Sequence, residues 1–501
     1  MQNSRTKNAK LNIIYGYIAQ MGILLLSFVG RRVFLHFLSA DYLGINGLYT
    51  NILTILSLPE LGMDTAIIYS LFKPIADDDK ALLSCMLRFF KKIYFVIAIC
   101  IVAVGICLVP FLGYLINSDL PSYDLICYYL LFLLNTTASY FVAYKVALLS
   151  AYQEQRIHKL VTLSANFILQ ILHIIALLIW KNYYVYLVTT VCTTLISNLI
   201  LNHICNKRHK DIFQTKQEVE FDTKPIKKHI ISVFFYKIGA VLINSTDNIL
   251  ISVLVSTLAV GYYSNYHTVI TAVSGFISII SSSLIAGIGN LSAQEKKADQ
   301  GALFDMMVFV FHTIAAIGLV GFSLLLNNFI ILWLGEEYIF DKWTVFIIAF
   351  NFYVSNAIAP IWMFREANGL FDRVKFLILI RAAFNIVLSV AFGILWGVFG
   401  IILATIVSLV ITSFWYEPRI ISREVFGRSS FVYWRKQVAY FSETCVSFGL
   451  GYLTTMHLGD SFMMLCVKAI ILIAMTGGVF LVCNMRTKEY KKIKRYVFSK
   501  W

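Results

Sequence analysis

Long apolar stretches dominate this sequence, and they constrain its fold more than any other feature. A helix that crosses a membrane needs about 20 mostly apolar residues, and fourteen such segments follow one another along the 501 residues. They lie approximately at residues 11–35, 43–72, 93–116, 122–150, 159–180, 184–205, 230–255, 260–292, 304–332, 343–364, 374–395, 397–416, 437–456 and 462–484. Because backbone amides inside a bilayer must bond within their own segment, the pattern predicts an all-α polytopic membrane protein with about 14 transmembrane helices.

The composition excludes several other classes of protein. Apolar residues make up 59% of the chain and charged residues 14%, whereas soluble domains average about 45–50% and 25%. A disordered chain or a string of soluble domains does not fit these values. The nine cysteines are scattered and form no CxxC pair, so we expect no metal site, no disulfide framework and no bound cofactor. Since no polar segment is long enough for a catalytic domain, we do not expect an enzyme.

The basic residues predict the orientation in the membrane. A net charge of +15 in a soluble protein would suggest nucleic-acid binding. With a cytoplasmic N-terminus, however, 34 of the 42 Lys and Arg fall in segments on one side, two (Lys181 and Lys342) on the other and six within spans. This bias predicts an even number of spans with both termini cytoplasmic. Nucleic acid is therefore not an expected partner, whereas membrane lipids are, at the basic tail.

Polar breaks divide the chain into two groups of six helices followed by two more. We expect these divisions: an N-terminal lobe (1–205), a cytoplasmic linker (206–229), a C-terminal lobe (230–416), a cytoplasmic loop (417–436), helices 13–14 (437–484) and a basic cytoplasmic tail (485–501).

A shift of 217 residues superimposes 38–44 on 255–261. The identities are Ser39 with Ser256, Gly44 with Gly261, and Tyr49 with Tyr266. Since six helices separate the copies, both enter the membrane in the same direction, which predicts a parallel repeat about an axis along the membrane normal. Two pseudo-symmetric lobes around a central cavity would form a transporter whose lobes rock to open either side.

Charged residues within spans are costly and point to partners or a cavity. Arg31 and Arg32 lie near the predicted outer end of the first helix, where they either snorkel to headgroups or bind an anionic group such as a phosphate. The 217-residue shift places Asp247 beside Arg31, and we expect an ion pair that closes the outer gate. Lys145 and Arg381 lie deeper than most cationic residues. They are either ordinary cytoplasmic anchors or part of an inner anion site.

Acidic and polar residues mark two further candidate positions. Glu60 and Asp64 lie four residues apart just after Pro59, so they share a helix face. They form either a hydrogen-bonded kink or a site that couples transport to a Na⁺ or H⁺ gradient.

The segment 260–292 carries a row of polar residues. Four of them are candidates to line a cavity for a sugar: Tyr266, His267, Ser274 and Ser278. Alternatively, the small residues only allow close helix packing.

The N-terminal motifs resemble a known family. They are GRRVF at 30–34, YLGINGL at 42–48, LPELG at 58–62 and YSLFKPI at 69–75. These motifs, with the 6+6+2 helix pattern, are similar to bacterial polysaccharide (O-antigen type) flippases of the multidrug/oligosaccharidyl-lipid/polysaccharide exporter superfamily. The resemblance implies movement of an undecaprenyl-pyrophosphate-linked oligosaccharide from the inner to the outer leaflet of a bacterial plasma (inner) membrane. It also implies that Arg31 and Arg32 hold the pyrophosphate, for surface polysaccharide or lipopolysaccharide synthesis.

The leading expectation is therefore a lipid-linked oligosaccharide flippase that works by alternating access, in possible contact with polysaccharide polymerase machinery. An ion-coupled drug or cation antiporter of the same superfamily is the alternative, and a lipid-II-type flippase is a close neighbour. A membrane glycosyltransferase or polymerase fits less well, because such enzymes usually need a sizeable outer loop and the loops here are short.

Overall fold

The computed structural model describes residues 21–498, apart from 61–62, 216, 218, 220 and 294–296. These residues form helices and turns, with no strand among them, so the all-α prediction is confirmed. Helices cover each of the fourteen apolar segments wherever they are described. Residues 11–20 of the first segment lie outside the described part, and its helix is described over 21–37.

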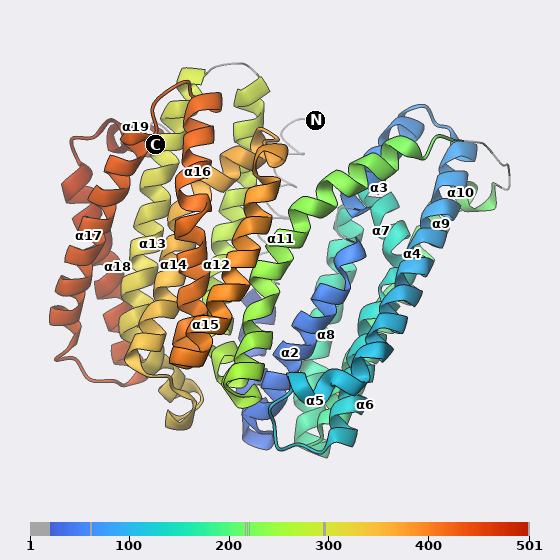
Figure 1. Cartoon of the computed structure of the whole chain (residues 1–501), viewed down its shortest axis with the longest axis horizontal. Helices are drawn as coiled ribbons and strands as arrows, with labels where there is room; N and C mark the ends of the chain where they lie inside the picture. The colour runs from blue at the N-terminus through green and yellow to red at the C-terminus, as the bar shows by residue number, and fades with distance from the viewer. Residues whose placement is uncertain are drawn as a thin grey trace. The chain divides into compact units, whose positions relative to one another are not determined.

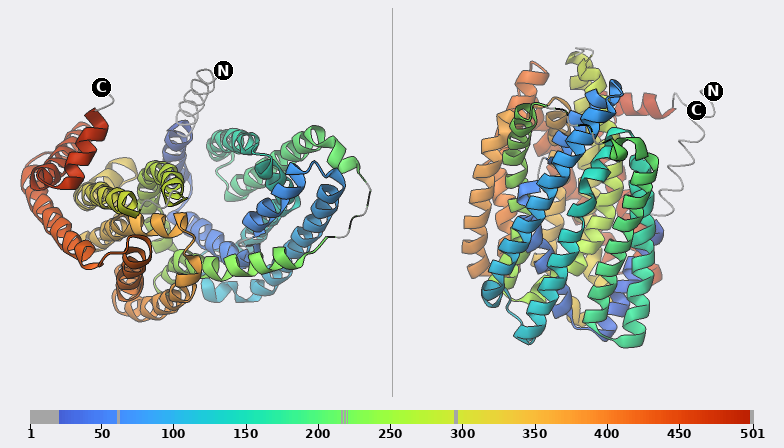
Figure 2. Two further views of the ribbon diagram at one scale, coloured as in Figure 1. Left: turned by 90° about the horizontal axis from the view of Figure 1, so that it is seen from above. Right: turned by 90° about the vertical axis from the view of Figure 1, so that its right-hand side faces the viewer.

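The helices of the first part of the chain are long and mostly parallel (Figures 1 and 2). Their bounds are α2 (Ala40–Leu56), α3 (Met63–Ala76), α4 (Lys80–Leu108), α5 (Leu112–Leu115), α6 (Ser122–Ala138), α7 (Tyr140–Ala151), α8 (Gln155–Trp180), α9 (Tyr183–Arg208), α10 (Lys210–Gln214) and α11 (Lys224–Leu254). A 3₁₀ turn, η1 (Leu58–Glu60), separates α2 from α3. The predicted segment 43–72 is thus two helices, because Pro59 lacks the amide that would continue the helical bonds.

The second part continues the same pattern. Its elements are α12 (Thr257–Ala293), α13 (Lys297–Trp333), η3 (Glu336–Tyr338), α14 (Lys342–Ala367), α15 (Phe371–Ile411), α16 (Ser413–Ile420), a π-helical turn (Ile421–Val425), α17 (Phe431–Thr455), α18 (Phe462–Asn484) and α19 (Lys488–Phe498). Gly397 has a positive φ of 59° that divides α15, which matches the predicted break between 374–395 and 397–416. Such a φ favours glycine.

Nine helices in the described residues are long and apolar enough to cross a membrane. This count is below fourteen partly because α2 and α3 have only 17 and 14 residues. In addition, Arg373–Val425 counts as one stretch despite the turn at Gly397.

The chain divides into two compact units, Met1–Gly261 (the first unit) and Tyr262–Trp501 (the second unit). The boundary falls inside α12, whereas we expected the lobes to separate at 206–229. α11 packs against α2 in the first unit, where a Cβ added at Gly47 would lie 3.6 Å from the Asn248 amide nitrogen. The compact unit therefore includes the helix that follows the linker.

Loops that were predicted to share a membrane side contact one another in the first unit. At one end, Lys80 pairs with Asp211 at 3.3 Å, and Arg208 pairs with Glu154 at 2.6 Å. At the other end, the Asn117 backbone amide donates to the Thr257 hydroxyl at 3.0 Å.

The second unit shows the same alternation. Arg428 binds Asp305 at 2.6 Å at one end, while the Asn328 amide, near the end of α13, donates to the Asp460 carboxylate at 2.5 Å at the other. The alternation of helix directions therefore agrees with the predicted order of loops in both units.

The proposed repeat has a structural counterpart at the crossing of α2 with the start of α12. A Cβ added at Gly44 would lie 1.9 Å from the Thr257 carbonyl oxygen, and one added at Gly261 would lie 2.1 Å from the Ala40 carbonyl oxygen. A shift of 217 exchanges these two contacts. The crossing is thus reciprocal, and only glycine allows the backbones to approach so closely.

The repeated tyrosines also have matching surroundings. Tyr49 is fully buried and donates to the Leu125 carbonyl at 2.7 Å. Tyr266 is fully buried as well, and its hydroxyl accepts from the Phe340 amide at 2.9 Å. Each tyrosine therefore fixes a segment 74 to 76 residues further along the chain, which supports the shift of 217.

Candidate transport site

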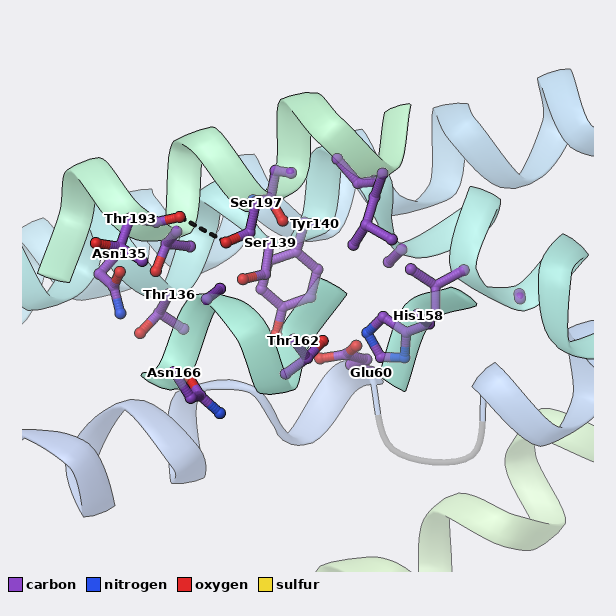
Figure 3. Close-up of a pocket in the computed structure, with 18 of the residues that line it drawn as sticks. Glu60, Asn135, Thr136, Ser139, Tyr140, His158, Thr162, Asn166, Thr193 and Ser197 are labelled. Carbon is purple, nitrogen blue, oxygen red and sulfur yellow. Dashed lines mark hydrogen bonds between the residues drawn. The ribbon is translucent and has the colours of Figure 1, made fainter. Parts of the chain in front are cut away.

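A polar pocket of about 690 Å³ opens within the first unit, between η1 and helices α3, α6, α7, α8 and α9 (Figure 3). Hydroxyl and amide groups make up most of its polar lining. Apolar helices place these groups here because residues three or four apart share one helix face, as Thr162 and Asn166 do on α8. This spacing concentrates polar groups on one side of an otherwise apolar helix.

Among the lining residues that the structure describes, Glu60 is the only Asp, Glu, Lys or Arg. It ends the η1 turn that Pro59 introduces, and Figure 3 draws its side chain at the same end of the pocket as His158. The predicted partner, Asp64, lies in α3, but its side chain is outside the described part of the chain. The described lining is thus rich in hydroxyl and amide groups and includes the Glu60 carboxyl group.

A second cavity of about 220 Å³ lies beside the polar pocket, and Asn135 lines both. His173 stacks on Tyr186 there, with ring centroids 3.7 Å apart, and its Nε2 lies 2.9 Å from the Thr190 hydroxyl. The two cavities therefore share one amide side chain as part of their wall.

Of the three predicted gate residues, one is linked to this second cavity, through a tyrosine that lines it. Arg31 is half-buried and interacts electrostatically with Tyr186, which lines the second cavity. Arg32 is exposed, and Asp247 is half-buried on α11. None of the three lines the polar pocket, and the Arg31–Asp247 ion pair stays a prediction.

Lys145 is buried, with 5% of its surface exposed. Its ammonium donates to the side-chain oxygens of Asn202 and Asn206 on α9 and lies 4.8 Å from the centre of the Phe213 ring. It does not line the polar pocket, although Val146 beside it does. In this conformation, Lys145 holds the end of α9 against α7 and α10.

Arg381 is half-buried on α15, one helical turn before Asn385. The Asn385 amide donates to the Thr405 hydroxyl at 2.9 Å, which joins the two arms of α15. Arg381 thus lies in the second unit, whereas Lys145 lies in the first. The predicted inner anion site would require residues from both.

The polar residues of α12 divide between two faces of the helix. A helix turns about 100° per residue, so His267, Ser274 and Ser278 lie on one face. His267 and Ser278 are exposed and Ser274 is half-buried. Tyr266 differs from our expectation of a cavity-lining side chain. It is buried on another face, where its hydroxyl donates to the Asn327 side chain at 2.6 Å.

An apolar groove of about 480 Å³ lies in the second unit, between α12, α13, α14 and α18. The lining residues that the structure describes are all apolar or glycine, including Val273 and Phe276 on the α12 face opposite Ser274 and Ser278. From α18, one of the two C-terminal helices, the lining residues are Leu465, Ala469, Leu472 and Ile473.

Sequence reasoning missed most residues of the polar pocket. Asn135 and Thr136 were visible as polar residues inside an apolar span, and Thr162 and Asn166 as a pair at helical spacing. Such residues are expensive in a bilayer unless they face one another or water. That signal identifies the lining helices, although not which of their faces meet.

The comparisons with known proteins agree with this architecture. A family model described as "Polysaccharide biosynthesis protein" matches residues 10–285, more than half of the chain. The chain belongs to the polysaccharide biosynthesis protein family. A search of curated protein sequences found no significant match for this family member.

Solved structures show which fold this polysaccharide biosynthesis protein has. It is similar to the lipid II flippase MurJ in an inward closed conformation, with a TM-score of 0.67 and 15% identity over 94% of this chain and 100% of the flippase. It is also similar to an inward-facing multidrug resistance MATE family transporter (TM-score 0.61, 12% identity, 81% of this chain and 98% of that one). The Vibrio cholerae MATE transporter VcmN follows, with a TM-score of 0.56 and 13% identity over 85% and 100% of the two chains. The chain therefore has the fold of this exporter superfamily.

Proposed function

We propose that this protein moves an undecaprenyl-pyrophosphate-linked oligosaccharide from the inner to the outer leaflet of the plasma membrane by alternating access. The apolar groove of the second unit carries this proposal. A polyprenyl chain is long and apolar, and a groove without a polar side chain can hold part of it at no cost in unpaired hydrogen bonds. One wall of the groove is formed by α18, which is one of the two helices that follow the two predicted groups of six.

Family membership supports the same function. The matching family is described by polysaccharide biosynthesis, and one structure with the same fold is that of a lipid II flippase. A substrate with an apolar chain and a polar head suits a protein that has both an apolar groove and a polar pocket. Contact with polysaccharide polymerase machinery remains a prediction.

In this proposal, Arg31 and Arg32 bind the pyrophosphate. A guanidinium group offers several donors in a planar array that matches phosphate oxygens, and Arg32 is exposed while Arg31 is half-buried. Lys145 contributes less directly, because its ammonium is bonded to Asn202 and Asn206.

Glu60 is the proposed coupling group for a Na⁺ or H⁺ gradient, with Asp64 as its sequence neighbour. A carboxylate in a pocket without a lining Lys or Arg attracts a cation or a proton. The same observation favours a second candidate function, an ion-coupled drug or cation antiporter. Glu60→Gln should abolish the dependence on the gradient in either case, so the transported molecule has to be identified directly.

The deciding experiment is deletion of the gene followed by analysis of lipid-linked intermediates. We expect completed oligosaccharide to accumulate on its carrier at the cytoplasmic face. Unchanged pools together with altered sensitivity to drugs or cations would contradict flipping and favour the antiporter.

The groove can be tested separately with two matched variants of α18. Ala469→Trp fills the groove, whereas Ala474→Trp adds the same side chain at an exposed position outside it. We expect the first to reduce flipping in reconstituted vesicles by at least about tenfold, because the indole occupies the apolar space proposed for the lipid chain. Equal activity of the two variants would argue against lipid binding in the groove.

A further inference from the structure

The polar pocket of the first unit contains hydrogen-bonding groups that the protein itself does not use. Within the described part of the chain, no hydrogen bond engages the side chains of Thr136, Thr162 or Asn166. By contrast, the Ser197 hydroxyl donates to the Thr193 carbonyl at 2.6 Å, and the Asn198 amide donates to the Ala138 carbonyl at 3.0 Å. Of these three free groups, Thr136 lies on α6, and Thr162 and Asn166 lie on α8.

These free groups lie in one chamber. Figure 3 draws Thr136 and Asn166 toward one end and Glu60 toward the other, with Thr162 between them. The side-chain oxygen of Asn135 is buried and also lacks a hydrogen-bond partner. A buried polar atom left unpaired costs free energy, so a ligand that pairs with it gains affinity.

The charge of the lining limits the class of ligand. Among the described lining residues none is Lys or Arg, Glu60 is acidic, and His158 lies at the same end as Glu60. A pyrophosphate would meet repulsion from the Glu60 carboxylate without a permanently charged cation among these residues, which matters most where water is scarce. A neutral ligand that both donates and accepts hydrogen bonds is compatible with this lining.

We propose that the polar pocket binds neutral sugar residues of the transported lipid-linked oligosaccharide, while the pyrophosphate lies outside it. This inference rests on the proposed function and assigns one part of the substrate to one site. A volume of about 690 Å³ is in the range of small-molecule binding sites. Sugar hydroxyls donate and accept, as threonine hydroxyls do, and the Asn166 amide offers both a donor and an acceptor to neighbouring hydroxyls.

The test measures binding of two probes to the purified full-length protein in lipid nanodiscs by native mass spectrometry. One probe is the lipid-linked oligosaccharide extracted from cells that lack this gene, and the other is undecaprenyl pyrophosphate without a glycan. We expect Thr162→Val with Asn166→Leu to weaken binding of the first probe about tenfold or more, because two hydrogen bonds are lost. Binding of the second probe stays unchanged.

Two further variants separate recognition from folding. Ser164→Ala removes a hydroxyl from the same helix outside the pocket, and we expect it to bind both probes normally. Thr162→Ser keeps the side-chain hydroxyl and removes only the methyl group, and we expect this variant to retain binding of the glycan-bearing probe.

The outcomes distinguish this inference from the proposed function. If the double variant binds both probes more weakly by the same factor, or binds both as tightly as the unmodified protein does, the sugar is not held in this pocket. Loss of Na⁺ or H⁺ dependence in the double variant without any loss of glycan binding would assign the pocket to a cation and overturn the inference. If the unmodified protein binds neither probe, the proposed function fails and this inference fails with it.

Discussion

Arg365 and Glu417 form a buried ion pair in the second unit, between α14 and α16. Their side chains are 9% and 1% exposed, and the Arg365 Nη1 lies 2.7 Å from the Glu417 Oε2. Removing one partner leaves an uncompensated charge, so Glu417→Gln should reduce the free energy of unfolding by about 3–5 kcal/mol. Unfolding in mixed micelles of lipid and denaturing detergent measures this change.

An exposed pair provides the control for this prediction. Arg373 and Glu424 lie 3.6 Å apart with side chains 65% and 36% exposed, and Glu424→Gln should cost less than about 1 kcal/mol. Similar losses for Glu417→Gln and Glu424→Gln would contradict the argument from burial.

The predicted Arg31–Asp247 gate is a second test at the scale of single residues. We expect Arg31→Asp and Asp247→Arg each to reduce flipping, and the double variant to recover part of the lost activity, because the attraction is restored with reversed sign. The exposed Arg32 is the control. Arg32→Asp combined with Asp247→Arg should give no recovery, and a double Arg31/Asp247 variant without recovery would count against the pair.

Among the elements, the crossing of α2 and α12 depends on two glycines. Gly44→Ala and Gly261→Ala each place a Cβ about 2 Å from a backbone carbonyl, so each should destabilise the first unit by about 1–3 kcal/mol or more. Gly275→Ala on the same α12 meets no atom within 4 Å and is the matched control. If thermal unfolding of all three variants is the same, the close crossing does not contribute to stability.

The last helix, α19, lies across the direction of the other helices of its unit (Figure 2). Lys436 on α17 binds Glu489 on α19 at 2.6 Å. Burial is the largest single effect and raises the pKa of the Glu489 carboxyl. The hydrogen bond from Lys436, a hydrogen bond from the Glu489 backbone and the positive charge of Lys436 together lower it by more, so the pKa lies below the ordinary value of 4.5. A lowered pKa stabilises the docked helix above pH 4.5, and this stabilisation is lost as the pH falls through the lowered value.

Hydrogen exchange of the α19 amides measures this docking. At neutral pH, Glu489→Gln should speed exchange roughly tenfold, because a charge-assisted hydrogen bond is lost. Glu336→Gln, in the η3 turn at the other end of the unit, should leave α19 unchanged. Protection that persists in Glu489→Gln would show that α19 is held by other contacts.

Sequence patterns predicted the helices well, because apolar length and polar breaks are properties of each segment alone. The division of α15 at Gly397 and the kink at Pro59 could be read from local residue chemistry. The site was harder to predict, since it depends on which faces of different helices meet. Tyr266 shows the difficulty, because its neighbour His267 is exposed while Tyr266 itself is fully buried.

For the whole molecule, the charge bias predicts which side each loop faces. With the nine native cysteines replaced, Lys181→Cys should react with a membrane-impermeant maleimide in intact cells. Arg486→Cys should react only after permeabilisation, because the cytoplasmic side carries most of the Lys and Arg. Both positions are exposed, so labelling reports their side of the membrane. The reverse pattern would invert the predicted topology.

The polar pocket is built entirely from residues 57–201, inside one unit. If that unit moves as a rigid body, the proposed sugar site keeps the same shape, and hence the same affinity, on both sides of the membrane. A ligand that binds two states equally shifts neither population. Binding at the sugar site would then not determine the direction of transport. Net export would have to be driven by an ion gradient or by removal of the product from the outer leaflet.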